Sequence, residues 1–305
     1  MVVHPPPVHP RALEHAESVL RHPIADESEL TAGVTIAPDK RYGFFTDTTL
    51  CIGCKACEVA CKEWNALPAD GFELTGQSYD NTGALSATTW RHVAFVERIA
   101  ADGERATAMP PYQSHWLMMS DVCKHCERAG CLEACPTGAL FRTEFDTVVV
   151  QQDVCNGCGY CVPACPFGVV ELSLADGKAH KCTLCYDRLK GGFEPACAKA
   201  CPTNSIQFGE LAELQAHAER RVGQLHDQGV LRAYLYGAPD TPGTTGAIGP
   251  LHAFFLLTDR PEVYNLPTAP SLPATRVRAG LLAGLATMTA LTLGAMAAFA
   301  LGDDE

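Results

Sequence analysis

Short stretches of apolar residues in the first half of the chain predict β-strands. Arg91 to Glu97 and Ser114 to Met119 read as strands within an insertion of about sixty residues between the first two cysteine groups. Ala139–Phe141 and Thr147–Val150 lie close together and read as a short hairpin. The chain therefore predicts mixed α and β structure built from short elements.

A helical period appears later in the chain. Five apolar residues fall on one face of a helix that Gly229 ends: Leu211, Leu214, Ala218, Val222 and Leu225. By contrast, residues 1–41 are rich in proline and predict an irregular arm with a short helix from Arg11 to Leu20. The arm has neither a twin arginine nor an apolar core segment, so we do not read it as an export signal.

The longest apolar stretch is Ala279 to Leu301, which contains no charged residue. As a helix it would be about 34 Å long, enough to cross a bilayer. A buried core helix is the alternative interpretation. Gly280 and Gly284 form a G-x-x-x-G pair suited to close packing on another membrane helix. We therefore predict a single transmembrane anchor that docks on a membrane partner.

All sixteen cysteines fall into four groups of four. The groups are Cys51, Cys54, Cys57 and Cys61; Cys123, Cys126, Cys131 and Cys135; Cys155, Cys158, Cys161 and Cys165; and Cys182, Cys185, Cys197 and Cys201. The first and third have the spacing C-x2-C-x2-C-x3-C, which is typical of cubane iron–sulfur ligands. Four groups with four thiolates per cubane predict four [4Fe–4S] clusters and hence electron transfer.

Zinc and disulfide bonds are the alternatives to iron. Tetrahedral zinc sites use two cysteine pairs separated by a longer loop, and only the fourth group would pass for one by itself. Disulfide frameworks belong to small secreted domains, whereas this protein is long enough for a core of its own. Three cysteines at two-residue spacing, found twice, favour iron–sulfur clusters over both.

In two-cluster ferredoxins the last cysteine of each run ligates the other cluster. We expect this fourth cysteine to start a helix and to point away from the first three. A proline follows it in three groups, at 136, 166 and 202, and we read these prolines as first helical positions. Lys62 stands there in the first group and leaves that helix entry less constrained.

The spacing of the groups predicts how they pair. The second and third are close in sequence and predict one ferredoxin-like lobe, so the first and fourth pair across it. The predicted ligand sets are Cys51, Cys54, Cys57 and Cys201; Cys61, Cys182, Cys185 and Cys197; Cys123, Cys126, Cys131 and Cys165; and Cys135, Cys155, Cys158 and Cys161.

The predicted fold is therefore α+β, with two nested ferredoxin-like lobes and a single C-terminal transmembrane helix. The expected divisions are an arm (1–41), an outer lobe with its insertion (42–110 and 180–210), an inner lobe (111–179), a C-terminal extension (211–275) and an anchor (276–302).

The net charge of the chain excludes one class of function. The formal net charge is −12, which argues against nucleic-acid binding. Basic residues stand near the cysteines instead, and each is either ordinary surface or a charge that raises cluster potentials. They are Lys55, Lys62, Lys124, Arg128, Lys181, Arg188 and Lys199. We expect neither His125 nor His180 to bind iron, because the cysteines already saturate four cubanes.

From about residue 42 to its C-terminus, the chain resembles the iron–sulfur β subunits of membrane-bound formate dehydrogenases. The resemblance is carried by Cys51-Ile52-Gly53-Cys54-Lys55-Ala56-Cys57, Val59-Ala60-Cys61, Glu63-Trp64-Asn65, Tyr79-Asp80-Asn81, Gly157-Cys158-Gly159-Tyr160-Cys161, Cys165-Pro166-Phe167, Lys181-Cys182-Thr183-Leu184-Cys185, Asp187-Arg188 and Glu194-Pro195-Ala196-Cys197.

The resemblance implies an electron-transfer subunit that is not itself catalytic. Its four clusters would take electrons from a molybdenum- or tungsten-pterin α subunit and pass them to a γ cytochrome b that reduces quinone. It also implies the crosswise ligation expected above. No catalytic residue is predicted in this protein.

Other interpretations stay open. The protein could instead serve a nitrate, polysulfide or dimethyl sulfoxide reductase or a hydrogenase, or be an iron–sulfur sensor or scaffold. Nitrate-reductase types generally replace one cysteine, and the sulfoxide type usually lacks the terminal span. The resemblance places the main domain on the outer face of the cytoplasmic membrane, which we prefer, whereas Arg276 and Arg278 favour the cytoplasmic side.

Overall fold

The computed structural model describes residues 36–71, 76, 79–97, 116–238 and 246–301. The helix predicted from Arg11 to Leu20 lies outside the described residues. The strands are β1 (Tyr42–Asp47), β2 (Arg91–Glu97), β3 (Trp116–Val122), β4 (Leu140–Arg142), β5 (Val148–Val150), β6 (Glu171–Leu172), β7 (Ala179–His180), β8 (Ile206–Glu210), β9 (Tyr234–Tyr236) and β10 (Ala253–Leu257).

The described helices are mostly short. They are α3 (Ala56–Trp64), α4 (Gly130–Glu133), α5 (Cys161–Ala164), α6 (Tyr186–Lys190), α7 (Ala196–Lys199), α8 (Leu211–Asp227) and α9 (Pro273–Leu301), with 3-10 turns η2 (Gly246–Ile248) and η3 (Pro261–Tyr264). From residue 36 onward, the described residues belong to one compact unit.

The central sheet has four strands in the order β8-β1-β10-β9. Its middle strand β1 pairs antiparallel with β8, opposing Phe44 to Phe208, and parallel with β10, opposing Phe44 to Ala253. The sheet thus joins segments that are far apart in the sequence.

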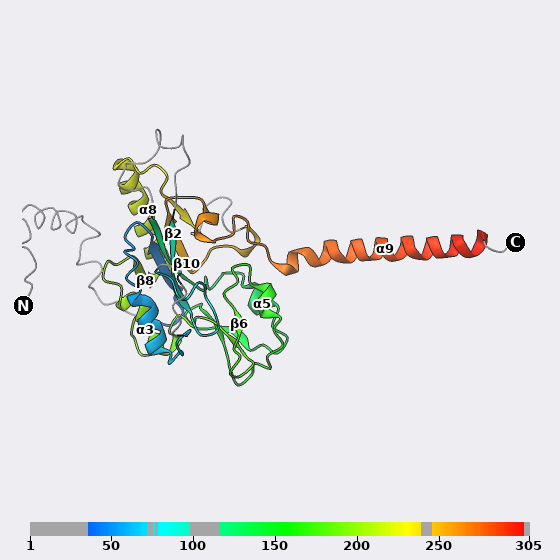
Figure 1. The fold of residues 1–305 in the computed structure, drawn as a ribbon, viewed down its shortest axis with the longest axis horizontal. Coiled ribbons are helices and arrows are strands. Elements are labelled where there is room, and N and C mark those ends of the chain that lie inside the picture. The colour runs from blue at the N-terminus through cyan, green and yellow to red at the C-terminus, as the bar shows by residue number, and fades with distance from the viewer. Residues whose placement is uncertain (1–35, 72–75, 77–78, 98–115, 239–245, 302–305) are drawn as a thin grey trace, which may run out of the picture. The chain divides into compact units, whose positions relative to one another are not determined.

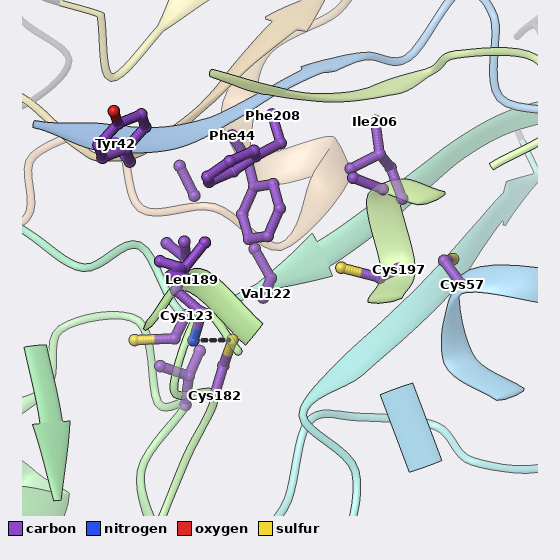
Figure 2. Packing of buried hydrophobic residues seen from close by; sticks show 14 of the residues in the cluster. Tyr42, Phe44, Cys57, Val122, Cys123, Cys182, Leu189, Cys197, Ile206 and Phe208 are labelled. Atoms are coloured by element: carbon purple, nitrogen blue, oxygen red, sulfur yellow. Dashed lines mark hydrogen bonds between the residues drawn. The ribbon is translucent and has the colours of Figure 1, made fainter. Parts of the chain in front are cut away.

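The two faces of this sheet have different roles. Successive side chains of a strand point to opposite faces. On one face, Phe45 stacks on Phe254 and packs in a cluster with Leu214 of α8, and Figure 1 shows α8 beside the sheet. Phe44 packs instead on Phe208 in a cluster that includes Cys57, Cys182 and Cys197 (Figure 2). One face of the sheet is therefore covered by a helix, and the other supports the cysteine-bearing segments.

Several sequence expectations are confirmed. The predicted strand at Arg91–Glu97 is β2, and it pairs along its whole length with β3. Of the strand predicted from Ser114 to Met119, positions 114 and 115 lie outside the described residues, and the rest belongs to β3, which runs on to Val122. The predicted hairpin is β4 with β5, where Leu140 opposes Val150. The predicted amphipathic helix is α8.

The expected position of the helices beside the cysteines is wrong. Helices α4, α5 and α7 each contain the third cysteine of their group, and the fourth cysteine follows the helix instead of starting it. The prolines at 136, 166 and 202 therefore stop helices, because proline cannot continue the backbone hydrogen-bond ladder. Where Lys62 replaces proline, α3 continues past Cys61 to Trp64.

Helix α9 has 29 residues, and its stretch Ala279–Ala298 is apolar and long enough to cross a membrane. None of that stretch is buried against the rest of the described residues, which argues against a core helix. Among the described residues it is the one candidate span.

Candidate iron–sulfur centres

Four cavities in the structure are each lined by four cysteines. Cavity A is lined by Cys51, Cys54, Cys57 and Cys201; cavity B by Cys61, Cys182, Cys185 and Cys197; cavity C by Cys123, Cys126, Cys131 and Cys165; and cavity D by Cys135, Cys155, Cys158 and Cys161. Each cavity brings together the members of one predicted ligand set. Their role as ligands stays a prediction.

The thiols of each cavity surround a space larger than a single metal ion would need. All sixteen cysteines are free, and no group of three or more His, Cys, Asp or Glu side chains in the described ranges converges as a single metal ion requires. The space among the thiols, counted together with the part open to solvent, is about 290, 240, 330 and 290 Å³ for cavities A to D. The donor set therefore fits a compact group with several metal ions.

A repeated backbone feature turns the thiols of each C-x-x-C loop inward. The residue before the second cysteine is left-handed in all four groups, at Gly53, His125, Gly157 and Leu184, with φ of 66°, 42°, 73° and 56°. Glycine adopts this conformation freely, whereas other residues need compensation of about 1–2 kcal/mol. The constraint applies to the loops that line all four cavities.

Short segments of the chain each contribute residues to two neighbouring cavities. Helix α3 carries Cys57 of cavity A and Cys61 of cavity B, and it packs on α7. Val122 lines cavity B and the adjacent Cys123 lines cavity C. Helix α4 carries Cys131 of cavity C and leads to the cysteine of cavity D that follows it. The cavities thus form a row in the order A, B, C, D.

Glycine permits the contact between α4 and α5. A Cβ atom on Gly130 would lie 2.5 Å from the carbonyl oxygen of Ala164 and 3.2 Å from Cδ2 of Leu272. These two helices supply Cys131 and Cys161, so the close approach helps to set cavities C and D.

Electrostatics show why these thiols need a positively charged occupant. Burial, with a smaller contribution from neighbouring cysteines, raises the pKa of Cys57 to about 12 and that of Cys131 to about 12. Burial, together with Cys197, likewise raises the pKa of Cys185 to about 12. Four thiolates in one cavity therefore require compensation by metal cations, which favour deprotonated ligands. The residues present fit iron–sulfur clusters, which would supply one-electron redox chemistry.

Two lysines beside cavity C lie in the interior. Burial works against the charge of Lys181, but the surrounding thiolates, first that of Cys123, raise its pKa. The amine of Lys181 donates to the carbonyls of Val148 and Cys182. Lys124 is paired with Asp121 and is equally buried. For these two basic residues, the interpretation as ordinary surface is wrong.

His125 is among the residues that line cavity C, and it is buried. The backbone N–H of Val148 donates to its Nδ1 over 3.1 Å. Burial, with the charge of Lys181, holds the pKa of His125 well below its ordinary value, so the ring is neutral and its proton is on Nε2. Nε2 is buried with no partner among the described residues. That His125 is not an iron ligand stays a prediction.

Sequence reasoning missed Arg91 and Ser120. Arg91 is 1% exposed, lines cavity B and lies 3.3 Å from the sulfur of Cys197. Ser120 Oγ lies 3.2 Å from the sulfur of Cys57. Nothing in the local sequence distinguished Arg91 from an ordinary residue at the start of a strand.

Only the ends of the row carry exposed cysteines. Cys54 of cavity A and Cys158 of cavity D are exposed, while the cysteines of cavity B are all buried and those of cavity C are buried or half-buried. The two ends of the row are therefore the places where cysteines reach the surface.

Comparison with known proteins supports this assignment. Two family models, each described as a 4Fe-4S dicluster domain, match residues 50–139 and 114–211. The two matches overlap and together include all four cysteine groups.

Curated relatives extend the match beyond the cysteine groups. The formate dehydrogenase iron–sulfur subunit of Haemophilus influenzae is 39% identical over 251 residues, covering 79% of this protein and 75% of the relative. The nitrate-inducible formate dehydrogenase iron–sulfur subunit of Escherichia coli is 41% identical over 230 residues, covering 74% and 72%. The B subunit of the anaerobic dimethyl sulfoxide reductase of Escherichia coli is 34% identical but covers only 57% of this protein. The chain therefore belongs to the family of formate dehydrogenase iron–sulfur subunits, the electron-transfer rather than the catalytic components of an oxidoreductase complex.

Proposed function

We propose that this protein holds four [4Fe–4S] clusters, one in each of cavities A to D, with the four lining cysteines as ligands. The observation that carries the proposal is the row of four cavities, each with four thiols. The crosswise sharing corresponds to two nested lobes, in which α3 packs on α7 and α4 packs on α5. The middle cavities are buried, whereas Cys54 and Cys158 are exposed at the two ends, which supports electron transfer along the row from one end to the other.

The two ends of the row suit two different partners. Leu272, directly before α9, lies beside Gly130 on α4, so the membrane helix starts next to cavities C and D. We assign the end at Cys158 to a membrane cytochrome b that reduces quinone. The end at Cys54 then receives electrons from a molybdenum- or tungsten-pterin subunit that oxidises formate.

Helix α9 would anchor the protein in the cytoplasmic membrane, with its main domain on the outer face. A single span encloses no channel and no quinone site, so its role is attachment and docking. The glycines at 280, 284 and 294 have open space around them, which permits close packing of a neighbouring helix.

The nearest alternative is that the protein is the electron-transfer subunit of a sulfoxide or nitrate reductase. The longer match to the formate dehydrogenase subunits favours formate over sulfoxide as the partner's substrate. The complete set of sixteen cysteines favours four cubanes over a set that includes a three-iron cluster.

The test is to purify the protein anaerobically from detergent-solubilised membranes with its bound partners. Formate should reduce its clusters, seen by electron paramagnetic resonance, and a pterin-containing large subunit should copurify. A partner that reduces nitrate or a sulfur compound, with no reduction of the clusters by formate, would overturn the assignment. Protease treatment of intact spheroplasts tests the side: protection of the cluster domain would contradict its placement outside.

A further inference from the structure

Arg91 lies between cavities A and B. Its Nη2 donates to the sulfur of Cys197 in cavity B over 3.3 Å, and its Nη1 donates to Ser120 Oγ over 3.3 Å. Ser120 Oγ in turn lies 3.2 Å from the sulfur of Cys57 in cavity A. A thiolate sulfur only accepts hydrogen bonds, so Ser120 is the donor to Cys57 once that cysteine is a ligand. One guanidinium therefore reaches cysteines of both cavities.

The surroundings of Arg91 supply little other compensation for a buried charge. The guanidinium carbon lies 4.7 Å from the centre of the Phe44 ring, and the backbone carbonyl of Ser120 accepts a further hydrogen bond. No carboxylate among the described residues forms an ion pair with Arg91, and its Nε is buried without a partner there. Isolated buried charges are strongly unfavourable, so the opposite charge must come from the cysteine cavities.

We propose that Arg91, with Ser120, is a shared positive charge that raises the reduction potentials of the clusters in cavities A and B. The inference rests on the proposed function, because it needs clusters in those cavities. Reduction adds one negative charge to a cluster, and a fixed cation nearby stabilises the reduced form. A cation between two clusters also weakens the repulsion between them when both are reduced. Arg91 therefore acts on the reduction potentials through its charge and is not itself a ligand of iron.

The alternative is that Arg91 only holds β2, β3 and α7 together. The two roles differ in what a lysine can do. Lysine keeps the charge but loses the planar fork that contacts both Cys197 and Ser120. A purely structural role needs the fork, whereas an electrostatic role needs mainly the charge.

The experiment is a potentiometric titration of the membrane-bound holocomplex, followed by electron paramagnetic resonance. The variants are Arg91→Gln, Arg91→Lys and Ser120→Ala, with Arg221→Gln as the control. Arg221 is on α8 and pairs with Asp47, and it lines none of the four cavities. The signals of cavities A and B are assigned as those lost in Cys54→Ser and Cys185→Ser.

Arg91→Gln should shift the one-electron reduction equilibrium of both clusters at least tenfold toward the oxidised form, about 59 mV. The other two potentials should stay unchanged. Arg91→Lys should restore most of the shift, Ser120→Ala should lower the potential of the cavity A cluster alone, and Arg221→Gln should change nothing.

Unchanged potentials in Arg91→Gln with all four signals present would overturn the inference, and so would an equal shift of all four. If Arg91→Gln loses clusters, the variants Ser120→Ala and Arg91→Lys decide between the electrostatic and the structural role. A wild-type potential of the cavity A cluster in Ser120→Ala would show a structural role, and so would loss of clusters in Arg91→Lys. Absence of the four signals from the wild-type complex would instead refute the proposed function.

Discussion

Replacing Gly130 with alanine should destabilise cavities C and D through a single methyl group. The added Cβ would lie 2.5 Å from the backbone oxygen of Ala164, a distance that real Cβ contacts essentially never show. The obstacle is backbone rather than a flexible side chain, so α4 and α5 must move apart. Those helices carry Cys131 and Cys161, and a displacement of about 0.5 Å is enough to disturb a preorganised site.

The magnitude follows from two opposing effects. Alanine in place of glycine inside a helix stabilises by up to about 1 kcal/mol, and overpacking costs about 1–3 kcal/mol. In the one-turn α4 the second effect should dominate, leaving a loss of about 1–2 kcal/mol. Gly223 is the matched control because it lies inside α8 with open space around it, so alanine there should be neutral or stabilising.

The assay is anaerobic thermal unfolding of the holocomplex, followed by the visible absorbance of its clusters. A loss of about 1–2 kcal/mol should lower the midpoint by about 2–8 °C, since each kcal/mol shifts a protein of this size by about 2–4 °C. Resonance spectra of samples taken along the same transition should show two of the four cluster signals weakening first. A Gly130→Ala variant with the wild-type midpoint and full cluster content would refute the close approach of α4 and α5.

Three further predictions test other parts of the structure. Cys165→Ser should perturb the same signal as Cys123→Ser and leave the one lost in Cys155→Ser intact; the reverse result in these resonance spectra would contradict crosswise ligation. Lys62→Met should lower the unfolding midpoint, because the amine of Lys62 pairs with Asp70 and donates to the carbonyl of Thr88 and to Oγ1 of Thr89. Each lost hydrogen bond to a charged group costs about 1.5–3 kcal/mol, and an unchanged midpoint would show that these bonds are not formed. Deleting residues 273–305 should release the cluster-bearing part from membranes in alkaline carbonate washes, and its retention there would show another attachment.

Local patterns made part of the fold predictable. The strand at Arg91–Glu97, the β4–β5 hairpin and the amphipathic α8 each follow from the order of apolar residues within a short segment. The parallel pairing of β1 with β10 was not predictable in this way, because it depends on packing between segments that are far apart in the sequence.

The cysteine groupings followed from spacing, while the residues around them did not. A proline after a cysteine is compatible with either the start or the end of a helix, and the structure has helix ends before the prolines at 136, 166 and 202 rather than the predicted starts. Arg91 opens a strand and reads as an ordinary edge residue until the fold brings Cys197 next to it. Contacts of this kind arise only from tertiary packing.

Chemical analysis of iron and acid-labile sulfide in anaerobically isolated protein tests the central claim most directly. Four cubanes, one for each cavity lined by four cysteines, predict close to sixteen iron atoms and sixteen sulfides per polypeptide. Zinc in place of iron, or cysteines joined as disulfides, would contradict the account.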